Sequence, residues 1–193
     1  MKVILLKSNL LEALNSVDKA IETSSNLPIL KSIQFVAEKN NKIILTSTNL
    51  ELAIKHTTSG KVIEDGTIVI PFEVFNSIVR NLNSEKVSLE QKDHTLVISA
   101  DNYEASIYCE DSKEFPIIPT IQNTRKFLKL KKVDFKKSLA QAVVATQYSE
   151  IRPEINGIYF RYENLHLTLV GTDSFRLVEK VLEQNKVQST LEE

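Results

Sequence analysis

The chain repeats itself once, and this repeat limits what it can fold into more than any other feature. The first copy contains Leu27-Pro-Ile-Leu-Lys-Ser-Ile-Gln-Phe, and the second contains Arg152-Pro-Glu-Ile-Asn-Gly-Ile-Tyr-Phe. Pro28 corresponds to Pro153, which lies 125 positions further on (153 − 28). A period of this length is far longer than that of a solenoid repeat, and it predicts tandem domains of one fold.

The correspondence continues on both sides of these strands. After the loop at residues 38–42 the offset falls to 124, because Thr48 corresponds to Thr172 (172 − 48). We therefore expect the second copy to have lost one residue from this loop. The helical pattern upstream is repeated as well, with the correspondences Leu10 to Phe135 and Leu14 to Leu139.

The repeat divides the 193 residues unevenly. Residue 67 of the first copy has its counterpart near residue 191, so the second copy has room for only the front of the same fold. We expect a complete domain at 1–120, a linker at 121–126 and the first half of a second domain at 127–193. The complete domain should contain two strand-helix-strand-strand-strand units. The fold class is α+β, with helices on one face of antiparallel sheets.

Local signals place several elements. Asn9, followed by Glu12 three residues later, is typical of a capping box at a helix start, and Asp134 is expected to cap the corresponding second helix. Residues 61–66 are expected to be a surface connection. A strand is expected at residues 175–182, with a frayed end after it.

Composition excludes some functions. A hydrophobic content of 42% with 25% charged residues is ordinary for a soluble globular protein, and no apolar run is long enough for a membrane span. Cys109 is the single cysteine, which fits a reducing compartment, and we expect a cytoplasmic protein. A net charge of −1 gives no overall attraction to nucleic acid, so any DNA contact must depend on where the charges lie.

No catalytic constellation is found. His56, His94 and His166 stand singly, without the spacing of metal ligands, and no glycine-rich phosphate loop occurs. We therefore expect no metal, no cofactor and no enzyme activity.

The stretch 172–177 allows two interpretations. Asp173 beside a hydroxyl could be a functional carboxylate, or, since Asn49 stands at the same place in the first copy, a turn residue that binds its own backbone. Phe175 and Leu177 alternate with Ser174 and Arg176, so each pair would share one face of a strand. An apolar pair beside a hydroxyl and a guanidinium suggests a groove for a peptide.

Seven motifs in register point to one family. They are Leu27-Pro-Ile-Leu, Leu45-Thr-Ser-Thr-Asn-Leu-Glu, Ile70-Pro, Ile78-Val-Arg-Asn-Leu, Phe115-Pro-Ile-Ile-Pro, Arg152-Pro-Glu-Ile-Asn-Gly-Ile-Tyr-Phe and Gly171-Thr-Asp-Ser-Phe-Arg-Leu. Together they resemble the bacterial DNA polymerase III beta subunit, the sliding clamp.

This resemblance implies a DNA-clamp fold and a non-catalytic role. Such subunits have three similar domains, and two subunits join head to tail in a ring around duplex DNA. The implied partners are DNA of any sequence, the polymerase III catalytic subunit and the clamp loader, bound through short peptides, and a second subunit, with no membrane. Weak contacts to the phosphate backbone suffice, because tight binding would stop sliding.

The resemblance also assigns residues to three surfaces. DNA contact is implied for Arg80, Gln147, Tyr148 and Arg152, with Lys136 and Lys137 on the candidate inner helix. The second domain's half of a peptide groove would comprise Ile155, Thr172, Ser174, Phe175, Arg176 and Leu177. The subunit interface would involve Phe75, Ile78, Leu82, Ala105 and Ile107. Residues 23–25 lack the basic residue often found in this family, and Ser174-Phe175 stands where many members have Gly-His.

Two functions remain open at this point. The chain is either a fragment of a sliding clamp or a truncated clamp-like interaction protein that binds replication factors or clamp subunits without encircling DNA. A reading frame that continues past residue 193 would favour the first.

Overall fold

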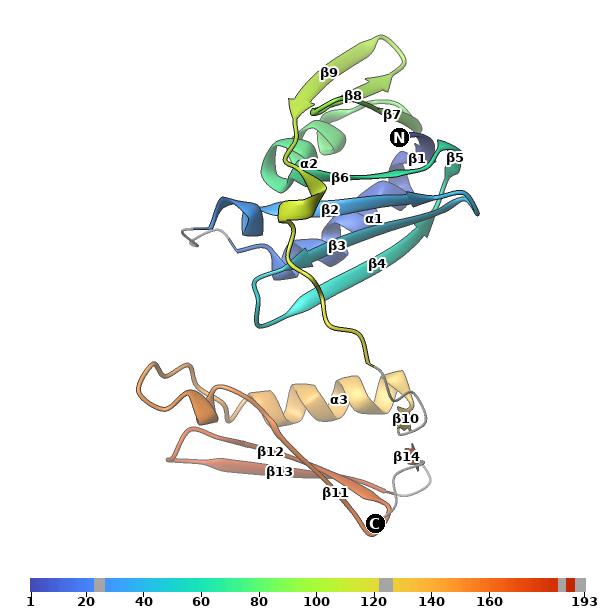
Figure 1. Ribbon diagram of the computed structural model, residues 1–193. Helices are drawn as coiled ribbons and strands as arrows, with labels where there is room; N and C mark the ends of the chain where they lie inside the picture. Colours follow the sequence, from blue (N-terminus) through green and yellow to red (C-terminus); the bar gives the residue numbers. More distant parts are fainter. Residues whose placement is uncertain (23–26, 122–126, 184–186, 190–193) are drawn as a thin grey trace. The chain divides into compact units, whose positions relative to one another are not determined.

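A computed structural model describes residues 1–22, 27–121, 127–183 and 187–189 (Figure 1). The chain forms two compact units, Met1–Pro119 and Thr120–Glu193. The loop at residues 23–25 and all but the first residue of the expected linker lie outside the described residues.

The first unit combines two antiparallel sheets with two helices. One sheet has the strand order β5-β1-β7-β8-β9 and the other the order β4-β3-β2-β6. The helices are α1 (Lys7–Val17) and α2 (Phe72–Asn81). The strands are β1 (Lys2–Leu6), β2 (Ser32–Glu38), β3 (Lys42–Thr48), β4 (Ala53–Ser59), β5 (Lys61–Glu64), β6 (Gly66–Pro71), β7 (Lys86–Lys92), β8 (Thr95–Ala100) and β9 (Tyr103–Tyr108).

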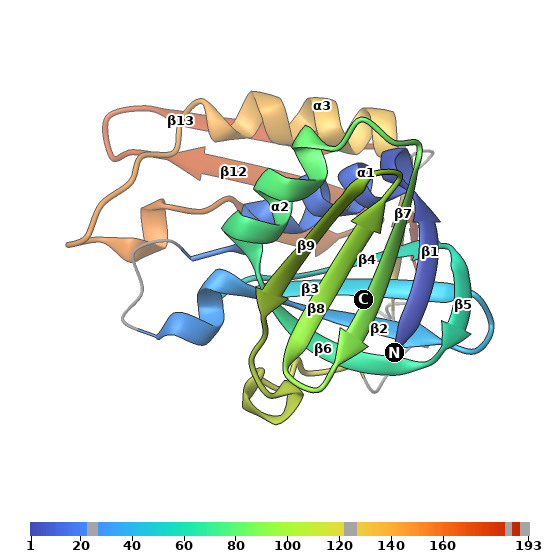
Figure 2. The same ribbon diagram turned by 90° about the horizontal axis from the view of Figure 1, so that it is seen from above.

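Both helices and both sheets of this unit share one core. Leu10 and Leu14 of α1 and Phe75 and Val79 of α2 recur at the spacing of one helix face, and all four are fully buried. Phe35 of β2 joins the same cluster from the four-stranded sheet. Burying each of these side chains is worth about 1.5–3 kcal/mol, so this face holds α1 and α2 side by side (Figure 2).

The second unit has a helix, a three-stranded sheet and a short strand pair. Helix α3 (Lys132–Val143) packs on the sheet β11-β12-β13. Its strands are β11 (Tyr159–Glu163), β12 (His166–Thr172) and β13 (Leu177–Leu182), and β10 (Leu128–Leu130) pairs with β14 (Val187–Ser189).

The register of the two hairpins confirms the predicted loop deletion. In the first unit Glu38 pairs with Lys42 across a loop of residues 39–41, whereas in the second unit Glu163 pairs with His166 across Asn164 and Leu165 alone. Both loop residues of the second hairpin have positive φ, 49° and 61°, as a two-residue type I′ turn requires.

The helices also approach the sheets at corresponding positions in the two units. In the first, the buried Ser47 hydroxyl donates to the Val17 carbonyl oxygen at 2.6 Å. In the second, Gly171 occupies the place of Ser47, and a Cβ added there would lie 2.3 Å from the Ala142 carbonyl oxygen. The glycine is therefore what allows the end of α3 to lie so close to β12.

One strand edge and one phenylalanine that are covered in the first unit are exposed at the corresponding positions of the second unit. Strand β2 is paired on both sides, with β3 and β6, whereas among the described residues β11 is paired only with β12. Phe35 on β2 is 0% exposed, and its counterpart Phe160 on β11 is 47% exposed, with its ring 6.2 Å from that of Phe135.

The predicted helix caps are wrong. Helix α1 begins at Lys7, with Leu6 as its N-cap and no side-chain cap, so Asn9 lies inside the first turn. Helix α3 begins at Lys132 after Lys131, which places Asp134 in its first turn. Each helix follows within two residues of a strand, and that strand fixes the helix start instead of a polar cap.

Two predictions about connections are also wrong. Most of residues 61–66 form strand β5, which pairs with β1, because Val62 and Lys61 face Val3 and Ile4 across the ladder. The frayed end predicted after residue 183 does not extend to residues 187–189, which pair with β10 as strand β14.

Candidate functional site

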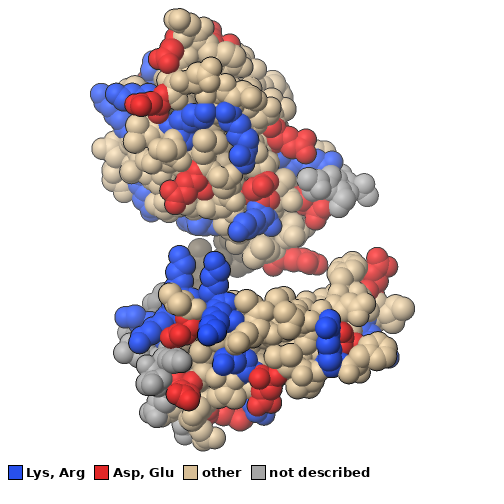
Figure 3. All heavy atoms as spheres, turned by 180° about the vertical axis from the view of Figure 1, so that it is seen from behind, with Lys and Arg blue, Asp and Glu red and all other residues tan. Residues whose placement is uncertain are grey.

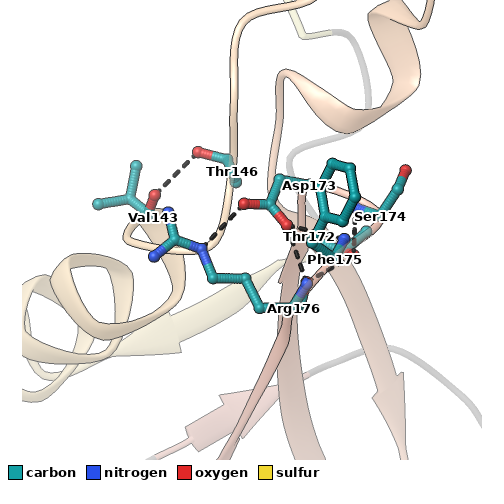
Figure 4. A network of polar contacts seen from close by, with 7 residues as sticks. All are labelled: Val143, Thr146, Thr172, Asp173, Ser174, Phe175 and Arg176. Atoms are coloured by element: carbon teal, nitrogen blue, oxygen red, sulfur yellow. Dashed lines mark hydrogen bonds and ion pairs between the residues drawn. The ribbon is translucent and has the colours of Figure 1, made fainter.

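The motif Thr172–Arg176 is a closed turn and not the beginning of a strand (Figure 4). The Thr172 hydroxyl donates to the Arg176 carbonyl oxygen at 2.8 Å, and Oδ1 of Asp173 accepts from the backbone N–H groups of Phe175 and Arg176 at 3.0 and 2.9 Å. Ser174 has a φ of 75°, in the left-handed region, so the alternation of strand faces predicted for residues 174–177 is wrong. Strand β13 begins only at Leu177.

Asp173 is a structural carboxylate in this turn. The backbone N–H of Arg176 is the main cause that lowers the pKa of Asp173, and the N–H of Phe175 and the side chain of Arg176 add to the effect. The Arg176 Nε lies 2.9 Å from Asp173 Oδ2. The interpretation of Asp173 as a turn residue is therefore confirmed.

The first unit builds the same turn with a neutral asparagine in place of the aspartate. The Thr48 hydroxyl donates to the Leu52 carbonyl oxygen at 2.9 Å, and Oδ1 of Asn49 accepts from the N–H groups of Glu51 and Leu52. The second turn has an ion pair because Asp173 stands in place of Asn49 and Arg176 in place of Leu52.

The structure places the groove residues around this turn. Phe175 is 95% exposed and Leu177 is 63% exposed, so both present apolar surface to solvent. Ser174 accepts a hydrogen bond from Arg152 Nη1 at 3.1 Å, which joins a residue assigned to DNA contact with one assigned to the groove. Ile155 is half-buried in a short 3-10 turn (Pro153–Ile155), next along the chain from the same loop.

The loop that carries Gln147, Tyr148 and Arg152 is held by two residues that sequence analysis did not identify. Asn156 Oδ1 accepts from the Ser149 N–H at 2.6 Å, and Ser149 Oγ accepts from the Arg152 N–H at 3.0 Å. Gln147, Tyr148 and Arg152 are all exposed. A Ser and an Asn seven positions apart in a polar segment are a weak signal, so only the fold reveals that they fix the loop.

Lysine side chains gather over β10 and the N-terminal end of α3 on one face of the second unit (Figure 3). Lys136 and Lys137 belong to this region and are exposed. Its other exposed members are Lys129, Lys131 and Lys132, which the sequence does not predict. Their spacing alternates along a strand and then follows a helix, so no single period reveals them.

Arg80 is exposed near the end of α2, where α1 passes beside it. Its Nε donates to Asn76 Oδ1 at 3.0 Å and its Nη2 donates to Asn15 Oδ1 at 2.5 Å. The side chain is thus held between the two helices.

The residues predicted for the subunit interface differ in burial. Phe75, Leu82 and Ile107 are 0%, 4% and 5% exposed and belong to the core of the first unit. Ile78 and Ala105 are half-buried. An alternating pattern divides a strand or helix into faces, but it does not say which face is turned inward.

The described part of the chain has neither a metal-binding cluster nor a membrane-spanning helix. No group of three or more His, Cys, Asp and Glu side chains is arranged to hold a metal ion there. None of the described helices has the length and hydropathy needed to cross a bilayer.

Comparison with known proteins defines the class. The sliding clamp of Bacillus subtilis has the same fold with a TM-score of 0.90 at 24% identity, over 98% of this chain and 53% of that one. A sliding clamp from Bartonella birtlesii, solved with griselimycin bound, gives a TM-score of 0.88 at 25% identity, over 95% of this chain and 50% of that one. The α+β fold predicted from the repeat is therefore the fold of the bacterial sliding clamps.

Sequence relatives give the same result. A beta sliding clamp of Staphylococcus aureus (strain Mu50 / ATCC 700699) is 30% identical over 184 residues, covering 90% of this chain and 48% of the relative. One from Staphylococcus epidermidis (strain ATCC 12228 / FDA PCI 1200) is 28% identical over 192 residues, covering 95% and 50%. The chain thus spans about half the length of the curated relatives it matches.

Family matches complete the identification. Residues 1–119 match the DNA polymerase III beta subunit, N-terminal domain, and residues 129–192 match the central domain of the same subunit. The chain belongs to the DNA polymerase III beta subunit family.

Proposed function

We propose that this chain is part of a DNA sliding clamp, a non-catalytic subunit that tethers replication proteins to duplex DNA. The observation that carries the proposal is the succession of the N-terminal and central domains of one family over residues 1–119 and 129–192. Relatives named beta sliding clamp cover nearly the whole chain. A cytoplasmic location goes with this role.

The proposed domain division is a complete clamp domain at 1–120, a linker at 121–126 and the first half of a second domain at 127–193. Its support is the correspondence of elements. The second unit contains, in order, counterparts of β1, α1, β2, β3, β4 and β5. The open edge of β11 and the 47% exposure of Phe160 are what a domain core would show without the counterparts of β6 and α2.

DNA contact is proposed for the residues assigned to it, Arg80, Gln147, Tyr148, Arg152, Lys136 and Lys137, and extended to Lys129, Lys131 and Lys132. All are exposed, and none is in an ion pair within the described residues. Unpaired exposed cations can each replace a counterion at a phosphate, which gives binding that does not depend on sequence.

The peptide groove is proposed to include the surface beside the Thr172–Arg176 turn. Phe175 and Leu177 offer exposed apolar area, and the Arg152 and Arg176 guanidinium groups lie around it. This combination suits a short peptide with apolar anchors and an acidic group.

Subunit contact is proposed for the edge of β9, together with the residues assigned to the interface, which are Phe75, Ile78, Leu82, Ala105 and Ile107. Among the described residues β9 is the last strand of its sheet, so one row of its backbone groups is open to pairing with a strand of a partner. Tyr103 and Tyr108 on this strand are 46% and 73% exposed.

Light scattering of the purified chain, alone and mixed with an intact clamp subunit, tests the proposal. A mixed complex in solution, together with weak binding to 30-base-pair duplexes of unrelated sequence, is the expected result for a clamp subunit. A chain that binds the intact subunit but no DNA at low salt would overturn DNA contact and favour an interaction protein. A chain that binds neither would overturn both functions for these residues.

A further inference from the structure

Arg80 is fixed in place by neutral partners. Asn76 on its own helix accepts from Nε, and Asn15 on the neighbouring helix accepts from Nη2. A guanidinium has five N–H donors, so these two bonds leave three of them available to a ligand. Because both asparagines use their side-chain oxygen, their NH₂ groups remain as further donors beside the guanidinium.

Because its partners are neutral, the positive charge of Arg80 is not neutralised by them. Arg176, in contrast, has the Asp173 carboxylate 2.9 Å from its Nε, and that pair is close to neutral as a whole. In the described part of the chain, no carboxylate forms an ion pair with Arg80. The side chain is therefore oriented in the way a salt bridge would orient it, but without losing its attraction for an anion.

Lys7 offsets the unfavourable end of α2. The C-terminus of a helix carries a partial negative charge, which would repel an anion at Arg80. The Lys7 Nζ donates to the carbonyl oxygens of Arg80 and Leu82 at 3.1 and 2.5 Å, so two of these terminal carbonyls are already covered by a cation. Glu12 and Glu73 lie one helical turn before Asn15 and Asn76, and Asp18 lies about one turn after Asn15. These acidic side chains oppose the arrangement.

We propose that Asn15 and Asn76 are positioning residues, which hold Arg80 ready to contact a backbone phosphate of duplex DNA at the junction of α1 and α2. This inference rests on the proposed DNA contact. Holding one long side chain in advance removes the entropy cost of ordering it when DNA binds.

The experiment measures binding of a 30-base-pair duplex by fluorescence anisotropy across a range of salt concentrations. Arg80→Gln should weaken binding and lower the slope of log K against log salt by about 0.9, the value for one lost phosphate contact. Asn15→Ala and Asn76→Ala should weaken binding about two- to tenfold, the cost of ordering one side chain, while the slope stays unchanged because no charge is lost. Asn81→Ala is the matched control, because Asn81 lies next to Arg80 and its amide donates only to the Ser77 carbonyl oxygen.

A conservative variant separates position from charge. Asn76→Asp keeps an oxygen acceptor for Nε but adds a negative charge, so it should weaken binding more than Asn76→Ala and lower the slope. In the double variant Arg80→Gln with Asn76→Ala, the second substitution should have no further effect, because nothing is left for Asn76 to hold.

Different results would overturn the DNA contact of Arg80 and the positioning role of the two asparagines. Wild-type affinity in the asparagine variants together with a loss in Arg80→Gln would overturn the positioning role and leave the DNA contact standing. Wild-type binding in Arg80→Gln would overturn both the DNA contact and the positioning role at this site. If the effects of Arg80→Gln and Asn76→Ala add independently in the double variant, only the positioning role is overturned. NMR supplies a readout without DNA: the Nε–H signal of Arg80 should exchange slowly with water in the wild type and rapidly in Asn76→Ala, and equal exchange would overturn the positioning role.

Discussion

Leu50 and Ser174 adopt the same left-handed backbone conformation, with φ values of 74° and 75°, at corresponding positions of the two units. Each follows an Asn or Asp whose side-chain oxygen accepts two backbone N–H groups. The turn is thus built twice from the same bonds, and only the second copy adds an ion pair.

Replacing Asp173 should separate the turn from the ion pair. Asp173→Asn keeps an oxygen for the two N–H groups, as Asn49 does, and should cost less stability than Asp173→Ala, which leaves both donors without their acceptor. Urea unfolding followed at pH 7 measures the order of the two variants. Equal losses would contradict the role of the backbone bonds.

The same residue predicts a pH dependence. The folded-state pKa of Asp173 lies below its unfolded value, so its contribution is present above the unfolded pKa of about 3.9 and is lost as the pH falls through the folded pKa. The stability difference between the wild type and Asp173→Asn should therefore shrink when unfolding is repeated in steps below pH 4. A difference that grows in acid would show that the sign is wrong.

Gly171 should not tolerate a larger side chain. In Gly171→Ala the new Cβ would lie 2.3 Å from the Ala142 carbonyl oxygen, so α3 must move away from β12, at a cost of about 1–3 kcal/mol. Hydrogen exchange measured on peptides from β12 and β13 isolates the effect to the second unit. Gly157→Ala is the control, since nothing lies within 4 Å of its Cβ position, and it should leave exchange unchanged.

Leu165 carries backbone strain that glycine would relieve. Its φ of 61° is a conformation that costs an L-residue about 1–2 kcal/mol, and glycine avoids this cost. Leu165→Gly should therefore be more stable than Leu165→Ala by about 0.5–1 kcal/mol in urea unfolding, once the greater freedom of glycine in the unfolded chain is subtracted. Leu165→Ala is the reference because it removes the side chain but keeps the Cβ.

Cys109 should be unreactive in the folded chain. Its side chain is 1% exposed, and burial raises the pKa of the thiol to about 11. At pH 8 a thiol reagent should label Cys109 only at the rate at which the first unit opens, and fully in urea. Rapid labelling without denaturant would contradict the burial.

The repeat predicted the backbone better than the surfaces. The offset of 125 changing to 124 predicted a shorter second hairpin loop, and the pairing of Glu163 with His166 confirms it. Such offsets can be detected in the sequence because both units need apolar residues at corresponding positions to fill their cores.

The features that the sequence did not predict depend on contacts between residues far apart in the chain. Strand β5 was missed because Lys-Val-Ile-Glu has no pattern of its own and becomes a strand only beside β1. Phe75 and Ile107 were assigned to an interface although both are buried, since hydrophobicity alone does not distinguish a core face from a partner face. The bond of Arg80 to Asn15 joins two helices that are far apart in sequence, so no local motif predicts it.

In the repeated turn, the residues whose side chains close the turn differ from the residues at its tip. Thr48 and Asn49, like Thr172 and Asp173, supply the bonds that close it, while the tip carries Glu51 and Leu52 in one unit and Phe175 and Arg176 in the other. Because the closing bonds do not use the tip side chains of the first copy, a gene that duplicates such a unit is free to vary the tip without unfolding the protein. The tip is thus the part of this repeated turn whose side chains can change while the backbone stays the same.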